Sequence, residues 1–222
     1  MKALIFDFDG LIVDTEVAEF EAWREVYAGH GAELTLEVWA DVVGSAQGYF
    51  DPVAYLEGLI GRPVDRAKVQ AQRRRRTMEI IEELPILPGV LEYLDEARDR
   101  GLLLGVASNS SHEWVEGHLA RKGLLDRFDV IRCAEDVEKA KPAPDLYLSA
   151  LSALDARPDE AIAFEDSPHG ARAAVAAGIY CVAVPSTLTK HLDFSFADLK
   201  LNSLADLPLA DLIRLAKNAE RV

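Results

Sequence analysis

Short apolar runs alternate with longer amphipathic segments along most of the chain. Five runs have the length and composition of buried strands, and they cover residues 3–6, 102–107, 128–133, 161–164 and 179–184. Helical segments separate the later runs, and this strand–helix alternation predicts a parallel sheet with helices on its faces. The tail from 199 to 222 predicts a short edge strand and a terminal helix. We therefore expect an α/β fold.

Two of the expected helices have readable ends. Ser111 can cap a helix that runs to the glycine at position 123, because its hydroxyl can accept from the first backbone N–H groups. Ser167 can cap the next helix, with Pro168 in the first turn and Gly178 at its exit. Both caps lie directly after apolar runs, so each helix should start at the end of a strand.

The segment between residues 16 and 85 has a different pattern. It lacks strand-like runs, and its apolar residues recur at helical spacing. Four helices are predicted, carrying Ala18, Phe20, Ala22, Trp23, Val26 and Tyr27; Leu36, Trp39, Val42 and Val43; Val53, Leu56, Leu59 and Ile60; and Met78, Ile80 and Ile81. The proline-rich stretch 84–89 is typical of a domain boundary. We expect a helical cap domain at 16–85, inserted into a core made of 1–15 and 86–222.

Composition excludes several classes of protein. The chain has 222 residues, half of them hydrophobic, and a net charge of −14, which argues against a nucleic-acid or anionic-membrane partner. No apolar run reaches membrane-spanning length, and Met1 and Lys2 lead directly into the first strand, so we expect a cytoplasmic protein. Cys133 and Cys181 lie in apolar runs and are expected to be buried free thiols.

Polar side chains follow four of the apolar runs. They are Asp7 and Asp9, Ser108 and Asn109, Lys141 in the loop after the third run, and Glu165 and Asp166. The carboxyl ends of parallel strands meet at one sheet edge, where open sheets of this kind bind ligands. Neighbouring carboxylates repel each other, and Mg²⁺ removes that cost while binding phosphate oxygens. This pattern predicts a metal-assisted phosphate site.

These residues form four motifs in a recognisable order. Asp7-Phe8-Asp9-Gly10, Ser108-Asn109, Lys141-Pro142 and Glu165-Asp166-Ser167 resemble the four motifs of the haloacid dehalogenase superfamily, particularly its phosphatase and β-phosphoglucomutase-like branch. The resemblance covers essentially the whole chain. It implies a Rossmann-like core with an inserted helical cap that closes over the substrate.

The resemblance also implies a role for each site residue. Asp7 is the expected nucleophile, because a carboxylate can form an aspartyl-phosphate. Asp9 is the expected general acid and base, and its backbone carbonyl is expected to reach the metal. The presence of Asp9 argues against carbon–halogen cleavage. Asp166 corresponds to the main Mg²⁺ ligand, and Glu165 is either a further ligand or a solvated acid.

The remaining motif residues are expected to bind the substrate phosphate. Ser108 and Lys141 would hold the phosphoryl oxygens by a hydrogen bond and by charge. Asn109 either contacts phosphate as well or stabilises the turn. Arg73 to Arg76 are expected mainly as a solvated helix face, although one of them could reach the cleft and attract an anionic substrate.

Three functions fit this pattern. The first is a Mg²⁺-dependent phosphatase acting on a small phosphorylated metabolite such as a sugar or polyol phosphate. The second is a β-phosphoglucomutase-like transferase, and the third is a catalytically idle binding protein. The cap histidine of the mutase aligns best with Glu19, and the cap loop 43–48 has Gln47 or its neighbours where the mutase has an arginine. Both departures favour the phosphatase.

Overall fold

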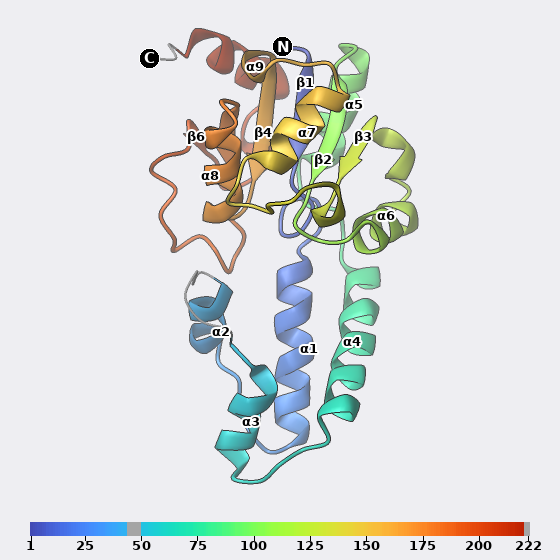
Figure 1. Cartoon of the computed structure of the whole chain (residues 1–222), viewed down its shortest axis with the longest axis vertical. Coiled ribbons are helices and arrows are strands. Elements are labelled where there is room, and N and C mark those ends of the chain that lie inside the picture. The colour runs from blue at the N-terminus through green and yellow to red at the C-terminus, as the bar shows by residue number, and fades with distance from the viewer. Residues whose placement is uncertain (44–49, 220–222) are drawn as a thin grey trace.

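The computed structural model describes residues 1–43 and 50–219. Its sheet has six parallel strands in the order β3-β2-β1-β4-β5-β6 (Figure 1). The strands are β1 (Ala3–Phe6), β2 (Leu103–Ala107), β3 (Val130–Arg132), β4 (Ala161–Glu165), β5 (Tyr180–Ala183) and β6 (Leu199–Lys200). The predicted parallel sheet and its short edge strand are confirmed. Phe6 pairs with Val106 and Phe164, so the residues that follow β1, β2 and β4 emerge at one level.

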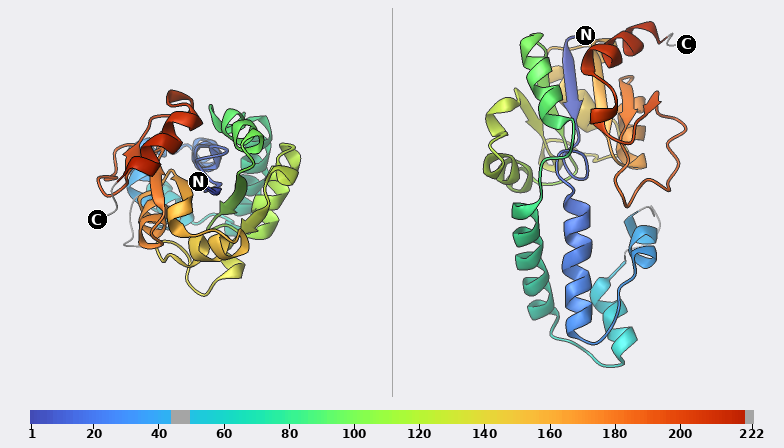
Figure 2. Two further views of the ribbon diagram at one scale, coloured as in Figure 1. Left: turned by 90° about the horizontal axis from the view of Figure 1, so that it is seen from above. Right: turned by 180° about the vertical axis from the view of Figure 1, so that it is seen from behind.

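Helices cover both faces of the sheet (Figure 2). One face packs against α5 (Val90–Asp99), α6 (His112–Arg121) and α9 (Leu209–Asn218), and the other packs against α7 (Asp145–Ala153) and α8 (Pro168–Ala176). Alternate residues of each strand serve the two faces, as the pleat requires. The alanines of α8 allow it to lie close to the sheet. Four short 3₁₀ turns complete the core: Leu125–Arg127, Ala134–Asp136, Pro158–Glu160 and Leu204–Asp206.

The two helix caps read from the sequence are present. Ser111 accepts a hydrogen bond from the backbone N–H of Trp114 at 3.3 Å, and Ser167 accepts from that of Gly170 at 3.1 Å. Cys133 and Cys181 are buried free thiols, as expected. Among residues 1–43 and 50–219, no helix is both long enough and apolar enough to cross a membrane.

Four further helices extend from one end of the sheet. They are α1 (Thr15–Gly29), α2 (Leu36–Val43), α3 (Pro52–Ile60) and α4 (Arg66–Glu83). Figures 1 and 2 show α1 and α4 running side by side away from β1. These helices have an apolar cluster of their own, built around Trp23, Tyr27 and Leu56, and Leu188 from the loop after β5 joins it. The four predicted helices are confirmed, whereas the division into domains at 16 and 85 stays a prediction.

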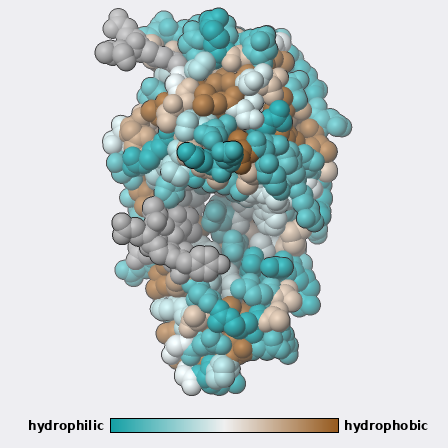
Figure 3. Space-filling model, viewed as in Figure 1, coloured by the Kyte–Doolittle hydropathy of each residue, from teal (hydrophilic) through white to brown (hydrophobic). Residues whose placement is uncertain are grey.

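Two residues assigned to the apolar faces of these helices lie at the surface. Leu36 is 45% exposed and Leu59 is 49% exposed. The N-terminal end of α3 contacts α1, where the Tyr27 hydroxyl donates to the carbonyl of Pro52 at 2.6 Å. Leu59 points away from the cluster, whereas its neighbour Ile60 packs against it. Figure 3 shows that the visible face of the molecule is largely hydrophilic, with hydrophobic residues scattered over it.

Candidate active site

The carboxyl ends of the central strands open into a cavity of about 400 Å³. Asp7 directly follows β1, Ser108 follows β2 and Asp166 follows β4, and all three side chains line this cavity. Lys141 reaches it from the loop that follows β3, and the cap helices contribute Glu16, Glu19, Arg73 and Thr77 to the opposite wall. The structure thus brings the residues of all four motifs to one site.

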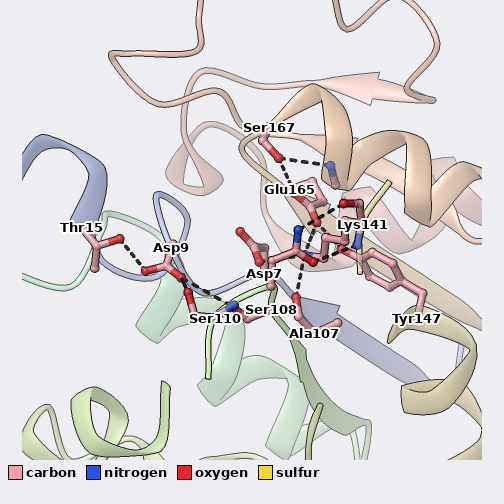
Figure 4. Close-up of polar contacts among 12 residues, drawn as sticks. Asp7, Asp9, Thr15, Ala107, Ser108, Ser110, Lys141, Tyr147, Glu165 and Ser167 are labelled. Atoms are coloured by element: carbon pink, nitrogen blue, oxygen red, sulfur yellow. Dashed lines mark hydrogen bonds and ion pairs between the residues drawn. The ribbon is translucent and has the colours of Figure 1, made fainter. Parts of the chain in front are cut away.

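Lys141 is the centre of a buried ionic cluster. Its ammonium donates to Asp7 Oδ1 at 2.7 Å, to Glu165 Oε1 at 2.6 Å and to the carbonyl of Ala107 at 2.6 Å. An ammonium has three protons, so these contacts use all of them. The Tyr147 hydroxyl also donates to Glu165 Oε1, at 2.6 Å. Figure 4 shows Asp7 lying between this cluster on one side and Asp9 on the other.

Burial and mutual repulsion disturb the titration of these carboxyl groups. Burial raises the pKa of Asp7 to about 7; Lys141 opposes this rise, and Glu165 and Asp9 add to it. Burial and the charges of Asp7 and Glu165 raise the pKa of Asp166 well above its ordinary value. Burial alone would lower the pKa of Lys141, but Asp7 and Glu165 outweigh it and raise that pKa. One ammonium does not neutralise three buried carboxylates.

The same carboxylates have the chemistry of a divalent-cation site. One oxygen from each of Asp7, Glu165 and Asp166 lies within 4.8 Å of the others, and ligand sets made only of oxygen suit Mg²⁺. Gly10 has a φ of +79° and packs against Asp166, where an added Cβ would stand 2.2 Å from Oδ2. The Thr189 hydroxyl donates to the carbonyl of Asp166 at 2.6 Å and fixes its backbone.

Glu165 is more deeply buried than Asp7 and Asp166, and both of its carboxylate oxygens have hydrogen-bond partners. Its side chain is completely buried, and Oε1 accepts from both Lys141 and Tyr147. The Ser167 hydroxyl lies 3.4 Å from Oε2. These contacts favour a role in holding Lys141 over the alternative of a solvated acid. Metal ligation by Glu165 stays a prediction.

Asp9 lies on the other side of Asp7 and accepts hydrogen bonds at both oxygens. Thr15 Oγ1 and Trp114 Nε1 donate to Oδ1 at 2.7 and 2.8 Å. Ser110 Oγ donates to Oδ2 at 2.6 Å, and Ser108 Oγ lies 3.4 Å from the same oxygen. Sequence reasoning identified Ser108 but missed Ser110, Thr15 and Trp114. Ser110 could have been identified from the sequence, because it lies two residues after Ser108 at the same strand end.

Asn109 makes two hydrogen bonds that bear on its two expected roles. Its side-chain oxygen accepts from the Lys141 backbone N–H at 2.8 Å, and its amide donates to the Lys141 carbonyl at 3.2 Å. These two bonds tie the loop after β3 to the end of β2. The geometry supports the turn-stabilising role, while phosphate contact by Asn109 stays a prediction.

One arginine of the run 73–76 does reach the cavity. Arg73 is 19% exposed at its side chain, lies 3.4 Å from Glu19 Oε1 and stands over the ring of Trp23 at 5.7 Å. Arg75 pairs with Glu79 on the same helix, whereas Arg76 pairs with both Glu79 and Glu25 of α1. The expected solvated face is confirmed for Arg74 and Arg75, which are exposed, while Arg76 is half-buried between α1 and α4. The cap loop 43–48 with Gln47 lies outside the residues whose side chains the structure describes.

Without divalent cations, the repulsion among Asp7, Glu165 and Asp166 should make the stability of the protein depend on pH. A carboxyl group whose pKa is raised on folding, as at Asp7 and Asp166, binds its proton more tightly in the folded state. The folded state therefore loses stability as pH rises from about 4 to about 7. We expect the melting temperature of the metal-free protein to fall by several degrees over this range, and saturating Mg²⁺ to reduce the fall. A melting temperature that climbs steadily with pH without metal would contradict this.

Comparison with known proteins agrees with this geometry. A sequence model of haloacid dehalogenase-like hydrolases matches residues 4–184. YhcW of Bacillus subtilis (strain 168) is 47% identical over 213 residues, which are 96% of each chain. Hexitol phosphatase B of Escherichia coli (strain K12) is 33% identical over 214 residues, covering 95% of this chain and 96% of the relative.

The fold is also similar to that of a solved structure, in which the related protein binds phosphate. The crystal structure of CbbY from Rhodobacter sphaeroides in complex with phosphate superposes with a TM-score of 0.74 at 31% identity. The match covers 96% of this chain and 99% of that one. The chain therefore belongs to the haloacid dehalogenase-like hydrolases and is a phosphoric monoester hydrolase.

Proposed function

We propose that this protein is a Mg²⁺-dependent phosphatase that hydrolyses a sugar or polyol monophosphate through an aspartyl-phosphate on Asp7. The observation that carries the proposal is the position of Asp7. It lies at the end of the central strand with one oxygen held by Lys141, in a cavity that also contains Asp9 and Asp166. A nucleophile, a proton carrier and a set of oxygen ligands stand within one site.

Two steps of chemistry follow from this arrangement. Asp7 Oδ2, which has no hydrogen bond within the described residues, attacks phosphorus while the bond to the leaving oxygen breaks and Asp9 gives that oxygen a proton. Water then attacks the phosphorus of the aspartyl-phosphate, Asp9 takes the proton from the water, and the Asp7–phosphorus bond breaks. Inorganic phosphate leaves, and both carboxyl groups return to their initial state.

The other residues hold and neutralise the reacting groups. Lys141 fixes Oδ1 of Asp7 and brings positive charge beside the transferring phosphoryl group, which is the main protein contribution to such transfers. Asp7, Asp166 and the backbone carbonyl of Asp9 would hold Mg²⁺, with Glu165 as a further candidate. When bound, Mg²⁺ supplies the positive charge that offsets the carboxylates and the phosphoryl oxygens.

The cap side of the cavity supports a small polar substrate. Arg73 and Glu19 form a partly exposed ion pair in the cavity wall. The pair offers hydrogen-bond donors and acceptors, which the hydroxyl groups of a sugar or polyol require. The name of the relative hexitol phosphatase B supports a polyol phosphate. The crystal complex of mutant CbbY with xylulose-(1,5)bisphosphate supports a sugar phosphate.

Phosphate release from a panel of sugar and polyol monophosphates, with and without Mg²⁺, tests the proposal. We expect Mg²⁺-dependent release from at least one of them. Supplying β-glucose 1-phosphate with catalytic glucose 1,6-bisphosphate separates the phosphatase from the mutase. Because the cap loop 43–48 lacks the arginine that could clamp a second phosphate, we expect inorganic phosphate rather than glucose 6-phosphate to accumulate. Faster formation of glucose 6-phosphate would favour the mutase, and no turnover on any substrate would favour the idle binding protein.

Asp166→Ala tests the proposed metal site. We expect the Mg²⁺ concentration for half-maximal activity to rise at least about tenfold and the maximal rate to fall, because a charged ligand is lost. Asp145→Ala, at the start of α7, serves as the control. An unchanged Mg²⁺ titration curve in a folded Asp166→Ala protein would remove this residue from the metal site and leave Glu165 as the stronger candidate.

A further inference from the structure

Trp114 differs from the other donors to Asp9 because its direction is fixed. The indole N–H points along one line in the plane of the ring, whereas a hydroxyl proton turns about its C–O bond. The half-buried Trp114 ring stands edge-on to His118, with 4.4 Å between ring centroids. His118 in turn stacks against the buried Phe8 at 6.2 Å. This packing leaves the indole N–H of Trp114 aimed at Asp9 Oδ1.

The contact also comes from a helix of the core. Ser111 accepts from the backbone N–H of Trp114, so the residue sits in the capped first turn of α6. Thr15, the other donor to Oδ1, is the first residue of the cap helix α1. Trp114 therefore ties Asp9 to the same sheet end that carries Asp7, independently of the cap helices.

The two oxygens of Asp9 are consequently held in different ways. Oδ1 has the fixed indole donor, whereas the donors to Oδ2 are the hydroxyls of Ser110 and Ser108. Rotation of the Ser110 hydroxyl frees Oδ2 for a substrate or water oxygen without moving the carboxylate. The indole keeps Oδ1 in place during that exchange. Oδ2 is thus the oxygen suited to pass the proton.

We propose that Trp114 is a positioning residue that fixes the Asp9 carboxylate through Oδ1, so that Oδ2 faces the reacting oxygens. The inference rests on the proposed function, in which Asp9 transfers the proton in both steps. A carboxylate released from Oδ1 can turn to other rotamers, and small misplacements of a catalytic group reduce the rate strongly. The indole N–H donates to Asp9, which carries the proton in the proposed reaction, so loss of this bond should fall on kcat rather than on KM.

Two variants separate the hydrogen bond from the packing of the ring. Trp114→Phe keeps an aromatic ring and removes the donor. Trp114→His removes the six-membered ring, but its Nε2 can occupy the place of the indole nitrogen. At about pH 8, where an imidazole is neutral, we expect kcat of Trp114→Phe to fall about tenfold with KM within about twofold. Trp114→His should lose less kcat while losing more thermal stability.

The order of the two variants decides the matter. If Trp114 served packing alone, Trp114→His would be the more impaired enzyme and Trp114→Phe would remain close to wild type. Either of these outcomes, or equal impairment of both variants, would overturn the proposal. Melting temperatures measured beside the kinetics show how much of each loss comes from stability.

A nuclear magnetic resonance measurement reads the hydrogen bond without any turnover. The chain has three tryptophans, and loss of one indole ¹H–¹⁵N signal in Trp114→Phe assigns that signal to Trp114. Asp9→Ala should move the Trp114 indole proton upfield and leave the signals of Trp23 and Trp39 in place. An unmoved Trp114 signal would refute the contact. Failure of the wild type to release phosphate from any monophosphate would instead refute the proposed function.

Discussion

Asp7→Asn should abolish phosphatase turnover without weakening the fold. The amide is a poor nucleophile, and removal of an essential nucleophile costs on the order of 10⁴-fold or more in kcat. The substitution also removes one of three crowded carboxylates, and the raised pKa of Asp7 shows that its charge is unfavourable there. We therefore expect the melting temperature of the metal-free protein at about pH 8 to equal or exceed that of wild type.

Phosphate release and thermal unfolding measured on the same preparation check this prediction. Asp99→Asn, at the exposed C-terminal end of α5, is the matched control and should leave both quantities unchanged. Activity of folded Asp7→Asn within about tenfold of wild type corresponds to only ~1.4 kcal/mol of barrier. Such a result would remove Asp7 from the role of nucleophile.

Lys141→Met should damage activity and stability together. Methionine has a similar shape but cannot donate to Asp7, Glu165 or the Ala107 carbonyl. Breaking a buried ion pair by removing one partner typically costs about 3 kcal/mol of folding free energy, because the other charge is left buried without compensation. Loss of a cation beside the transferring phosphoryl group should reduce kcat on the order of 10³-fold.

The pH dependence of this variant provides a second test. At low pH Asp7 and Asp166 hold protons, so the stability lost by Lys141→Met should shrink as pH falls below about 7. Lys139→Met, two residues away and exposed, is the control and should show neither effect. A Lys141→Met protein as stable as wild type at about pH 8 would mean that the buried carboxylates are compensated by other groups.

The core of the site could be predicted because strand direction determines where side chains emerge. β1, β2 and β4 are parallel and in register, so Asp7, Ser108 and Asp166 had to meet once the strands were recognised. Three of the four motifs directly follow an apolar run in the sequence, and the Lys141 motif follows the third run after a loop. The chemistry of these residue types then indicated phosphate and a divalent cation before any distance was known.

The supporting contacts could not be predicted in the same way. Trp114 and Tyr147 lie on helices where their apolar bodies fit an ordinary packing pattern, so their polar atoms gave no signal. Arg73 stood in a run of four arginines, and only the packing of α4 against α1 determines which one turns toward Glu19. Leu36 and Leu59 show the opposite error: both fit a helical pattern of apolar residues, yet both side chains are exposed in the structure.

Most buried apolar residues of the cap helices form a cluster of their own, and only Ala18 and Ile81, near the ends of α1 and α4 that meet the sheet, join the cluster on one face of the sheet. Mutations that reshape the cap wall of the cavity therefore need not disturb the strands that present Asp7 and Asp166. Natural selection can in this way replace Glu19, Arg73 and their neighbours while the reaction chemistry is inherited unchanged. Relatives with different substrates can thus diverge through changes in the inserted helices. A chimera that carries the cap helices of a relative should accordingly take on the substrate range of that relative.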